Sequence, residues 1–148
     1  MRLLLGRVLS PVRASQLLAA QGARPYVERV LAALRRRRTP VAVARVVPER
    51  FADVAADGRP LETLLFQPAV TARRARAAGQ TWRESHILGA VQLDMIVRTE
   101  VADAGRTATG AQIAATPTVG YVRMLSPPSC ARCAILAGQF YRWNAGFQ

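Results

Sequence analysis

The sequence feature that most constrains the fold is a capping box followed by a long apolar stripe between residues 81 and 115. Thr81 can accept a hydrogen bond from the Glu84 amide, and the Glu84 side chain can reach back to the threonine. Apolar residues then recur at helical spacing until Thr116-Pro117 ends the pattern. The stripe consists of Leu88, Val91, Leu93, Met95, Val97, Val101 and Ala104. This pattern predicts one long central helix.

The residues before this helix predict a succession of shorter helices. Residues 1–22 are rich in arginine, leucine and alanine, and Pro11 splits them into two short apolar pieces, which is typical of an arm that docks on another surface. Pro25 suits the first position of a further helix, whose apolar residues at 27, 30, 31 and 34 form one stripe. Four arginines would end that helix, where positive charge is favourable. They are Arg35, Arg36, Arg37 and Arg38.

The next segments predict an extended stretch and three more helices. Residues 41–47 are rich in valine and bounded by prolines, so we expect an extended chain or a single strand there. Residues 48–57 are expected to form a short helix with Phe51 and Val54 facing inward. Two helices are expected at residues 61–66 and 69–78. The second of these presents Arg73, Arg74 and Arg76 on its outer side.

The last thirty residues predict a small β-hairpin around a C-x-x-C turn. One strand is expected at residues 119–125, where Pro127-Pro128 would end it, and another at residues 139–143. Ser129 can cap a short helix that begins at Cys130 and Cys133, and Gly138 can end that helix. The predicted fold class is therefore mainly α, with a small α+β element at the C-terminus.

The charge of the chain is strongly positive, and this bears on its partners. The formal net charge is +12, and all 21 basic residues are arginine. Such a surface attracts polyanions and acidic protein faces. No apolar run reaches the roughly 20 residues of a membrane span, and we expect no signal peptide. Two cysteines three residues apart are not a secreted disulfide framework, so we expect a cytosolic protein or a particle assembled in the cytosol.

The C-terminal half carries a combination of motifs that resembles a known family. Val97-Arg98-Thr99-Glu100 lies on the long helix, and a strand follows it. The chain then reads S-C-A-R-C-A-I-L-A-G-Q-F-Y-R-W-N-A-G-F. Together these motifs resemble the Mu F-like minor head proteins of tailed phages, most closely those of phages that infect actinobacteria. The likeness covers residues 80–148, whereas residues 1–79 are similar only in their helical character.

The resemblance implies a structural component of the phage head. Family members act during procapsid assembly, associate with the portal protein and the capsid interior, and are present in few copies. Some touch DNA or are carried into the host. Residues 1–79 would then dock on the portal or capsid, and residues 80–148 would form the Mu F-like domain. The implied location is the virion, with non-specific contact to packaged double-stranded DNA, no membrane and no small-molecule substrate.

Cys130 and Cys133 have three interpretations. Their place at the start of a helix puts both sulfur atoms on one side of a turn, which suits a metal. Family members continue into a His-Pro-x-Cys-x-Cys element, and this sequence departs from them because it stops at Gln148, just before that element. The resemblance therefore implies either that further ligands lie beyond Gln148 and these cysteines are half of a zinc site, or that this protein lacks the complete site. A structural zinc ion needs four ligands. The alternatives are a redox pair between a strand and a helix, and two buried thiols in a small core.

Other polar residues have a structural and a functional interpretation. The arginines at 35–38, with Arg73, Arg74 and Arg76, are either solvated helix surface or contacts to DNA or to acidic portal loops. Arg98, Thr99 and Glu100 are interpreted as structural, because polar residues inside an apolar helix face tie it to a neighbouring element, such as the C-terminal hairpin. Ser85 and His86 are adjacent on one helix and point about 100° apart, which does not suit a catalytic pair.

Three functions follow from these residues. We expect a structural minor head protein without catalytic activity, because no catalytic constellation is recognisable in the sequence. The enzyme alternative is a capsid maturation protease, a label that some actinobacterial relatives carry, or an effector delivered with the DNA. The third is a basic, free-standing module that binds DNA without sequence preference.

Overall fold

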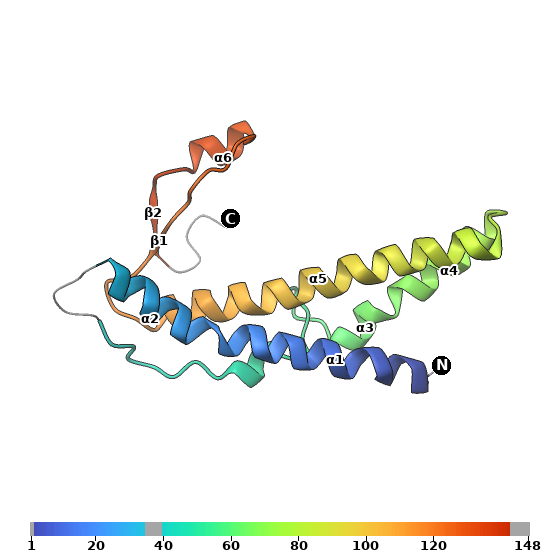
Figure 1. Cartoon of the computed structure of the whole chain (residues 1–148), viewed down its shortest axis with the longest axis horizontal. Helices are drawn as coiled ribbons and strands as arrows, with labels where there is room; N and C mark the ends of the chain where they lie inside the picture. The colour runs from blue at the N-terminus through green and yellow to red at the C-terminus, as the bar shows by residue number, and fades with distance from the viewer. Residues whose placement is uncertain (1, 35–39, 143–148) are drawn as a thin grey trace. The chain divides into compact units, whose positions relative to one another are not determined.

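The structure is a computed structural model that describes residues 2–34 and 40–142 (Figure 1). It is mainly helical, with one long helix and a small antiparallel hairpin near the C-terminus, which confirms the predicted fold class. The chain forms two units, Met1–Ala23 with Val47–Ala108, and Arg24–Val46 with Thr109–Gln148. The predicted boundary at residue 79 falls inside the first unit.

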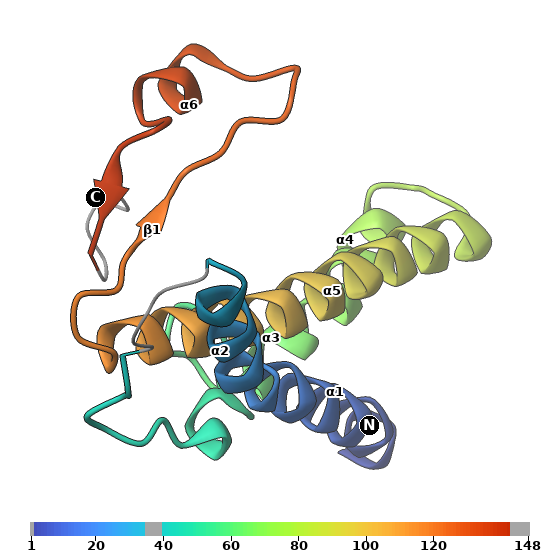
Figure 2. The same cartoon turned by 60° about the vertical axis from the view of Figure 1, so that its left-hand side comes forward.

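The first unit is built from helices, which are α1 (Arg2–Gln21), the 3-10 helix η1 (Pro48–Phe51), α3 (Leu61–Leu65), α4 (Gln67–Ala77) and the part of α5 (Trp82–Ala114) up to Ala108. Of these, α4 lies along α5 in both Figure 1 and Figure 2, while α1 contacts η1 and α3. α4 and α5 approach closely at Gly89. A Cβ atom there would lie 3.0 Å from the Pro68 carbonyl oxygen and 3.3 Å from the Ala72 Cβ. Only glycine fits this contact without a shift of the neighbouring chain.

Two small apolar clusters hold the first unit together. Val12 of α1, Leu61 and Leu65 of α3 and Ile96 of α5 are buried together, and Leu61 has no exposed surface. Each fully buried leucine contributes about 1.5–3 kcal/mol. The second cluster is thinner, because it consists of Ala20, Ala23 and Ala108 with Phe51 beside them. The core is therefore made of leucine, valine, isoleucine and alanine, with one aromatic ring at its margin.

The capping box at the start of α5 is confirmed. The Glu84 amide donates to Thr81 Oγ1 at 3.3 Å, and the Thr81 amide donates to Glu84 Oε2 at 2.8 Å. The Thr81 hydroxyl also donates to the same carboxylate oxygen at 2.7 Å. These hydrogen bonds, the one from the hydroxyl first, lower the pKa of Glu84 below its ordinary value.

Pro11 does not divide the N-terminal segment, contrary to the prediction. α1 runs without a break from Arg2 to Gln21 and contains Pro11. A proline inside a helix costs about 3 kcal/mol, because it removes one hydrogen bond and crowds the preceding turn. The buried residues Val12, Gln16 and Ala20 follow it at four-residue spacing, so α1 buries one face after the proline. This burial offsets the cost.

The helix predicted at residues 48–57 is also wrong in its second half. Only Pro48–Phe51 is helical, and Val54 forms an isolated bridge with Pro60 while remaining 40% exposed. Asp53 has a φ of 68°, which no right-handed helix accommodates. The Ala55 amide then donates to the Arg59 carbonyl at 2.8 Å, so the chain makes a turn instead of a helix.

The second unit contains most of α2 (Ala23–Ala33), the last turns of α5 and the hairpin. Of the predicted α2 stripe, Val27 and Leu31 are buried, whereas Val30 and Leu34 are exposed. The segment at residues 41–47 is extended without forming a strand, and the Val43 amide donates to the Ala115 carbonyl at 2.8 Å. This hydrogen bond joins the segment to the end of α5.

The hairpin has shorter strands than predicted. β1 (Tyr121–Val122) pairs with β2 (Phe140–Tyr141) in an antiparallel register, and α6 (Ala131–Ile135) lies between them in sequence. Ser129 is not the cap of α6, because its hydroxyl donates to the Ser126 carbonyl at 2.9 Å. Cys130 caps α6 instead, since its side chain accepts a hydrogen bond from the Cys133 amide. Gly138 has a φ of 74° after α6, in the conformation expected of a glycine that ends a helix.

The capping box gives a pH-dependent prediction. Since the folded state lowers the pKa of Glu84, the stabilisation from its charged form is present above the unfolded value, and it is lost as the pH falls through the folded value. Substitution Thr81→Ala should raise the pKa of Glu84 toward its ordinary 4.5. The difference in unfolding free energy between wild type and Thr81→Ala should become smaller as the pH falls and Glu84 is protonated. An NMR titration of the Glu84 carboxyl carbon measures this, with Thr107→Ala as control. Equal pKa values in wild type and Thr81→Ala would contradict the assignment.

Candidate functional site

The hairpin of the second unit presents both cysteines at its surface. Cys130 Sγ and Cys133 Sγ are 3.2 Å apart, whereas a disulfide bond measures about 2.05 Å. The Cys133 amide points at Cys130 Sγ from 3.4 Å, so one sulfur atom is oriented by the first turn of α6. Cys130 is exposed and Cys133 half-exposed. The interpretation as two buried core thiols is therefore wrong.

Contacts within the hairpin hold the turn that carries the cysteines. The rings of Tyr121 and Tyr141 are stacked with centroids 5.5 Å apart. The Tyr141 hydroxyl donates to the Leu136 carbonyl at 3.1 Å, directly after α6. The Gly138 amide donates to the Arg123 carbonyl at 3.1 Å and so closes the far end of the hairpin. The two thiols thus lie on a turn that is fixed at both of its ends.

This arrangement fits half of a tetrahedral zinc site. Two thiolates bound to one zinc ion lie about 3.8 Å apart, so a small side-chain rotation would bring the sulfur atoms of Cys130 and Cys133 to that spacing. Within residues 2–34 and 40–142, no group of three or more histidine, cysteine, aspartate or glutamate side chains could hold a metal ion. The pair supplies two ligands. The redox alternative finds little support, because α6 has five residues and the sheet has two strands.

Within the Arg98-Thr99-Glu100 motif, Glu100 ties α5 to a loop of the first unit, whereas we expected a contact with an element such as the C-terminal hairpin. Glu100 is buried, and its Oε2 accepts a hydrogen bond from the Ala56 amide at 3.0 Å. Arg98 pairs with Asp94 on the surface, with Arg98 Nε 2.9 Å from the carboxylate, and Thr99 is exposed. The structural interpretation of Glu100 is confirmed, with the loop at residues 52–60 in place of the C-terminal hairpin.

Gln16 completes this connection, and sequence reasoning missed it. It is fully buried, and its Nε2 donates to the Val54 carbonyl at 3.1 Å and to the Glu100 carbonyl at 3.5 Å. Its Oε1 accepts from the Asp53 amide at 3.0 Å. The available signal was its place between Val12 and Ala20, where helical spacing favours an apolar residue.

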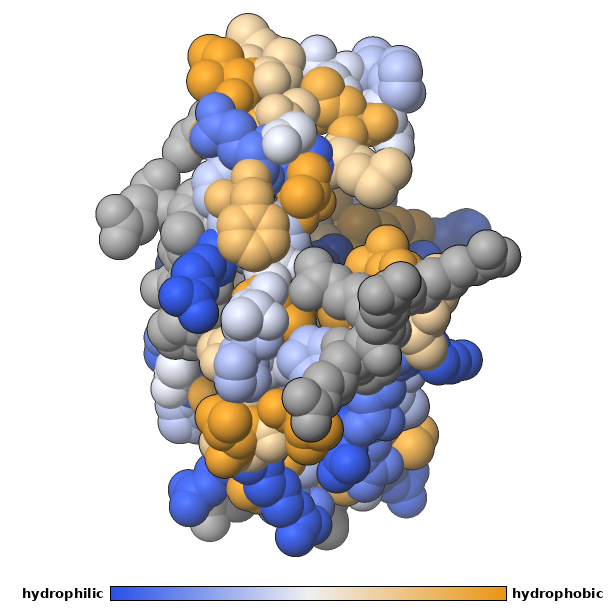
Figure 3. All heavy atoms as spheres, turned by 90° about the vertical axis from the view of Figure 1, so that its left-hand side faces the viewer, coloured by the Kyte–Doolittle hydropathy of each residue, from blue (hydrophilic) through white to orange (hydrophobic). Residues whose placement is uncertain are grey.

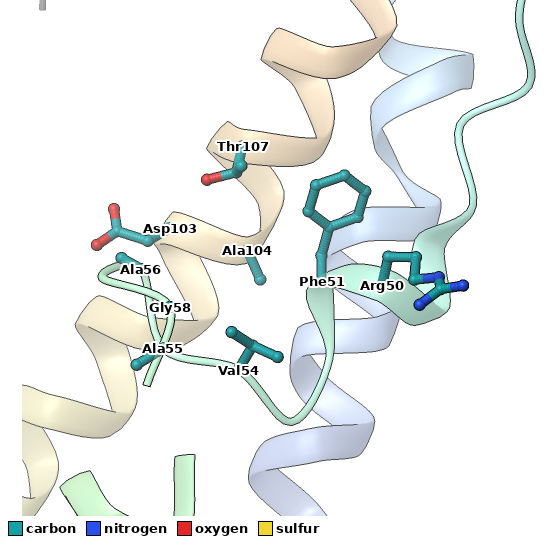
Figure 4. Close-up of a pocket in the computed structure, with 9 residues that line it drawn as sticks. All are labelled: Arg50, Phe51, Val54, Ala55, Ala56, Gly58, Asp103, Ala104 and Thr107. Atoms are coloured by element: carbon teal, nitrogen blue, oxygen red, sulfur yellow. The ribbon is translucent and has the colours of Figure 1, made fainter. Parts of the chain in front are cut away.

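A small hollow lies beside this loop (Figure 4). Its volume is about 220 Å³, below the roughly 300–1,000 Å³ of ordinary small-molecule pockets. Its lining is mostly apolar, and Arg50 and Asp103 lie on opposite sides of it in Figure 4. The Asp103 carboxylate pairs with Arg106. The hollow is lined by Arg50, Phe51, Val54, Ala55, Ala56, Gly58, Asp103, Ala104 and Thr107. We assign it no ligand.

The charge of the chain is divided unequally between the two units. The first unit has eleven arginines against eight acidic residues, and the second has ten arginines against one, Glu28. Arg73, Arg74 and Arg76 lie on α4 in the first unit, and Arg76 Nη1 donates to the Gln80 carbonyl at 2.7 Å. Arg73 and Arg74 are exposed, as predicted. The arginines at 35–38 belong to the second unit by sequence and lie outside the described residues.

Ser85 and His86 both point at the same carbonyl group. The hydroxyl of buried Ser85 donates to the Trp82 carbonyl at 2.8 Å, and His86 Nδ1 lies 2.9 Å from that oxygen. The imidazole also lies against the Trp82 ring, with centroids 3.9 Å apart. Both side chains thus belong to the first turn of α5.

The buried amide of Gln16 gives a stability prediction. Substitution Gln16→Ala leaves the part-buried Asp53 amide and Val54 carbonyl without this partner, at a cost of at most about 1–3 kcal/mol for each group. We expect the free energy of unfolding to fall by about 2–4 kcal/mol in urea titrations, and the Asp53 amide to exchange faster with deuterium. Gln21→Ala, at an exposed position of the same helix, should change stability by less than about 0.5 kcal/mol. Equal losses in the two variants would contradict the role of Gln16.

No described helix is long and apolar enough to cross a membrane. Comparisons with known proteins add no relative, because no protein family, no curated protein and no solved structure matches this chain.

Proposed function

We propose that this chain is a structural minor head protein of a tailed phage, which associates with the portal and the capsid interior during head assembly. The motif combination of residues 97–148 is its basis in sequence. The observation that carries it is the charge of the second unit, where ten arginines accompany a single acidic residue. A protein of the capsid interior lies against packaged DNA, and this composition suits such a neighbour.

The ion pairs of the two units support this distinction. In the first unit, four arginines pair with acidic side chains: Arg13 with Asp53, Arg59 with Asp57, Arg98 with Asp94 and Arg106 with Asp103. In the second unit the single acidic residue, Glu28, pairs with Arg24 at 2.8 Å. The arginines of this unit therefore outnumber its acidic side chains by nine. Such an excess of positive charge attracts phosphate groups.

The surface of the hairpin suits a protein neighbour as well. Figure 3 shows hydrophobic side chains at its upper end, where Figure 1 places the hairpin. Met124 is 90% exposed and Ile135 72% exposed, and other large apolar side chains of the hairpin are also on the surface. They are Val122, Leu125 and Phe140. Exposed apolar surface of this kind is typical of a segment that is covered in an assembly, such as a portal or capsid contact.

The proposed DNA contact is tested with the full chain and a fluorescent duplex. Binding should be independent of sequence and weaken steeply with salt, because each phosphate contact adds about 0.9 to the slope of log affinity against log salt. The triple variant Arg35→Gln, Arg36→Gln, Arg37→Gln should lower this slope by about 2–3.

The matched control removes the same charge from the first unit. Arg73→Gln, Arg74→Gln, Arg76→Gln should lower the slope by less than about 1, since eight acidic residues accompany the arginines there. Equal effects of the two triples, or no binding at low salt, would contradict a DNA contact by the second unit. Mass spectrometry of mature virions, with cross-linking to the portal, tests the head assignment separately. Absence of the chain from the virion would contradict it.

A further inference from the structure

The first half of α5 carries an apolar stripe on its outer side. Ile87, Leu88, Val91 and Met95 are 52%, 42%, 62% and 60% exposed. At 100° per residue, these four positions lie within about 100° of the helix circumference. They form one continuous strip about 12 Å long, since each residue advances the helix by about 1.5 Å.

The opposite side of α5 is already buried within the first unit. Ser85, Ile96 and Glu100 are buried there, and Gly89 lies against α4. Leu93 and Val97 pack beside Ile96 against the core of the first unit, so this part of α5 carries apolar side chains on a covered face as well as on the exposed one. A helix that is hydrophobic on both sides is typical of a helix that is buried in its final assembly. The exposed face therefore favours a partner.

We propose that this partner is a second copy of the chain, whose α5 crosses the first in antiparallel orientation at Val91. The residues of α5 are arranged symmetrically about Val91. Ile87 and Met95 lie four residues to either side of it, and Glu84 and Arg98 lie seven residues to either side. An antiparallel crossing at Val91 therefore places Ile87 against Met95 of the other copy, and Glu84 against Arg98, twice in each dimer. Such a twofold contact is self-complementary.

The charges of this surface favour a second copy over other partners. The two acidic residues Glu84 and Asp94 balance Arg83 and Arg98, so the region has no net charge to select a strongly acidic or basic protein. A parallel pair would bring Glu84 beside Glu84 and Arg98 beside Arg98, which is unfavourable. The antiparallel pair converts both repulsions into attractions.

The shape of the stripe also suits a crossing of two helices. Ile87, Val91 and Met95 form a ridge at four-residue spacing, with Leu88 beside it. Two such ridges interdigitate at an angle of about −50°, the commonest geometry of helix contacts in globular proteins. Four apolar side chains from each copy make a small interface, so we expect a weak dimer with a dissociation constant on the order of micromolar.

The first experiment uses opposite charge changes and sedimentation velocity of the full chain. In the dimer, position 84 of each copy faces position 98 of the other. Arg98→Glu therefore places two carboxylates opposite each other, and Glu84→Arg places two guanidinium groups opposite each other. Each variant alone should dimerise about tenfold more weakly than wild type, because like charges then face each other. An equimolar mixture of the two variants should recover dimerisation, since in the mixed dimer the positions 84 and 98 of one copy are both acidic and those of the other are both arginine. The proposal would be overturned if neither variant dimerised more weakly than wild type, or if a mixture of the two folded variants did not recover dimerisation.

The second experiment avoids the capping box, because Glu84→Arg also weakens the start of α5. In a background of Cys130→Ser and Cys133→Ser, Val91→Cys places two thiols at the twofold axis. Mild oxidation with diamide should link most of the chains, whereas Ala102→Cys, at an exposed position about three turns away, should link few. Circular dichroism confirms that each variant is helical. A monomeric wild type at about 100 μM, or equal linking at both positions, would exclude this dimer and leave the stripe to a different protein.

Discussion

The side-chain amide of Gln16 is the interaction on which the first unit depends, because it joins α1, the loop at residues 52–60 and α5. It makes hydrogen bonds with two backbone groups of the loop, and Glu100 satisfies a third at Ala56. An irregular loop beside apolar helices exposes polar backbone groups that cost about 1–3 kcal/mol each when unsatisfied. The buried Gln16 and the Glu100 carboxylate remove this cost, so the loop can lie against α1 and α5 and lead into Leu61 of the core.

The sequence predicted the elements whose signals are local. The hydrogen bonds of Thr81 with Glu84 lie within one turn, and the stripe that follows requires only regular spacing, so α5 was predictable from beginning to end. The loop was not, because its hydrogen bonds reach residues distant in sequence, as in the 37-residue separation of Gln16 and Asp53. The same reason explains Pro11. The cost of a proline inside a helix predicted a break at Pro11. The burial of Val12 and Ala20, which only the fold reveals, favours a continuous α1.

The candidate site was predictable in its residues but only partly in its geometry. The spacing of Cys130 and Cys133 placed both sulfur atoms at the start of α6, where the structure has them 3.2 Å apart. Spacing could not show which side chain caps α6. Ser129 is one residue too early for its hydroxyl to reach the amide that donates to Cys130 Sγ. Exposure of the thiols also depends on the hairpin, whose two-residue strands leave α6 without a covering layer in the described residues.

The unequal division of charge between the units would keep the two proposed associations, with a second copy and with DNA, from interfering with each other. An apolar contact between two copies fails if the same surface carries a large excess of one charge, because like charges repel within a Debye length of about 8 Å. Phosphate binding needs that excess. The first unit has eleven arginines against eight acidic residues and exposes an apolar stripe on α5, whereas the second has nine more arginines than acidic residues. The proposed contact between copies and the proposed DNA contact would thus each use a unit whose charge suits it.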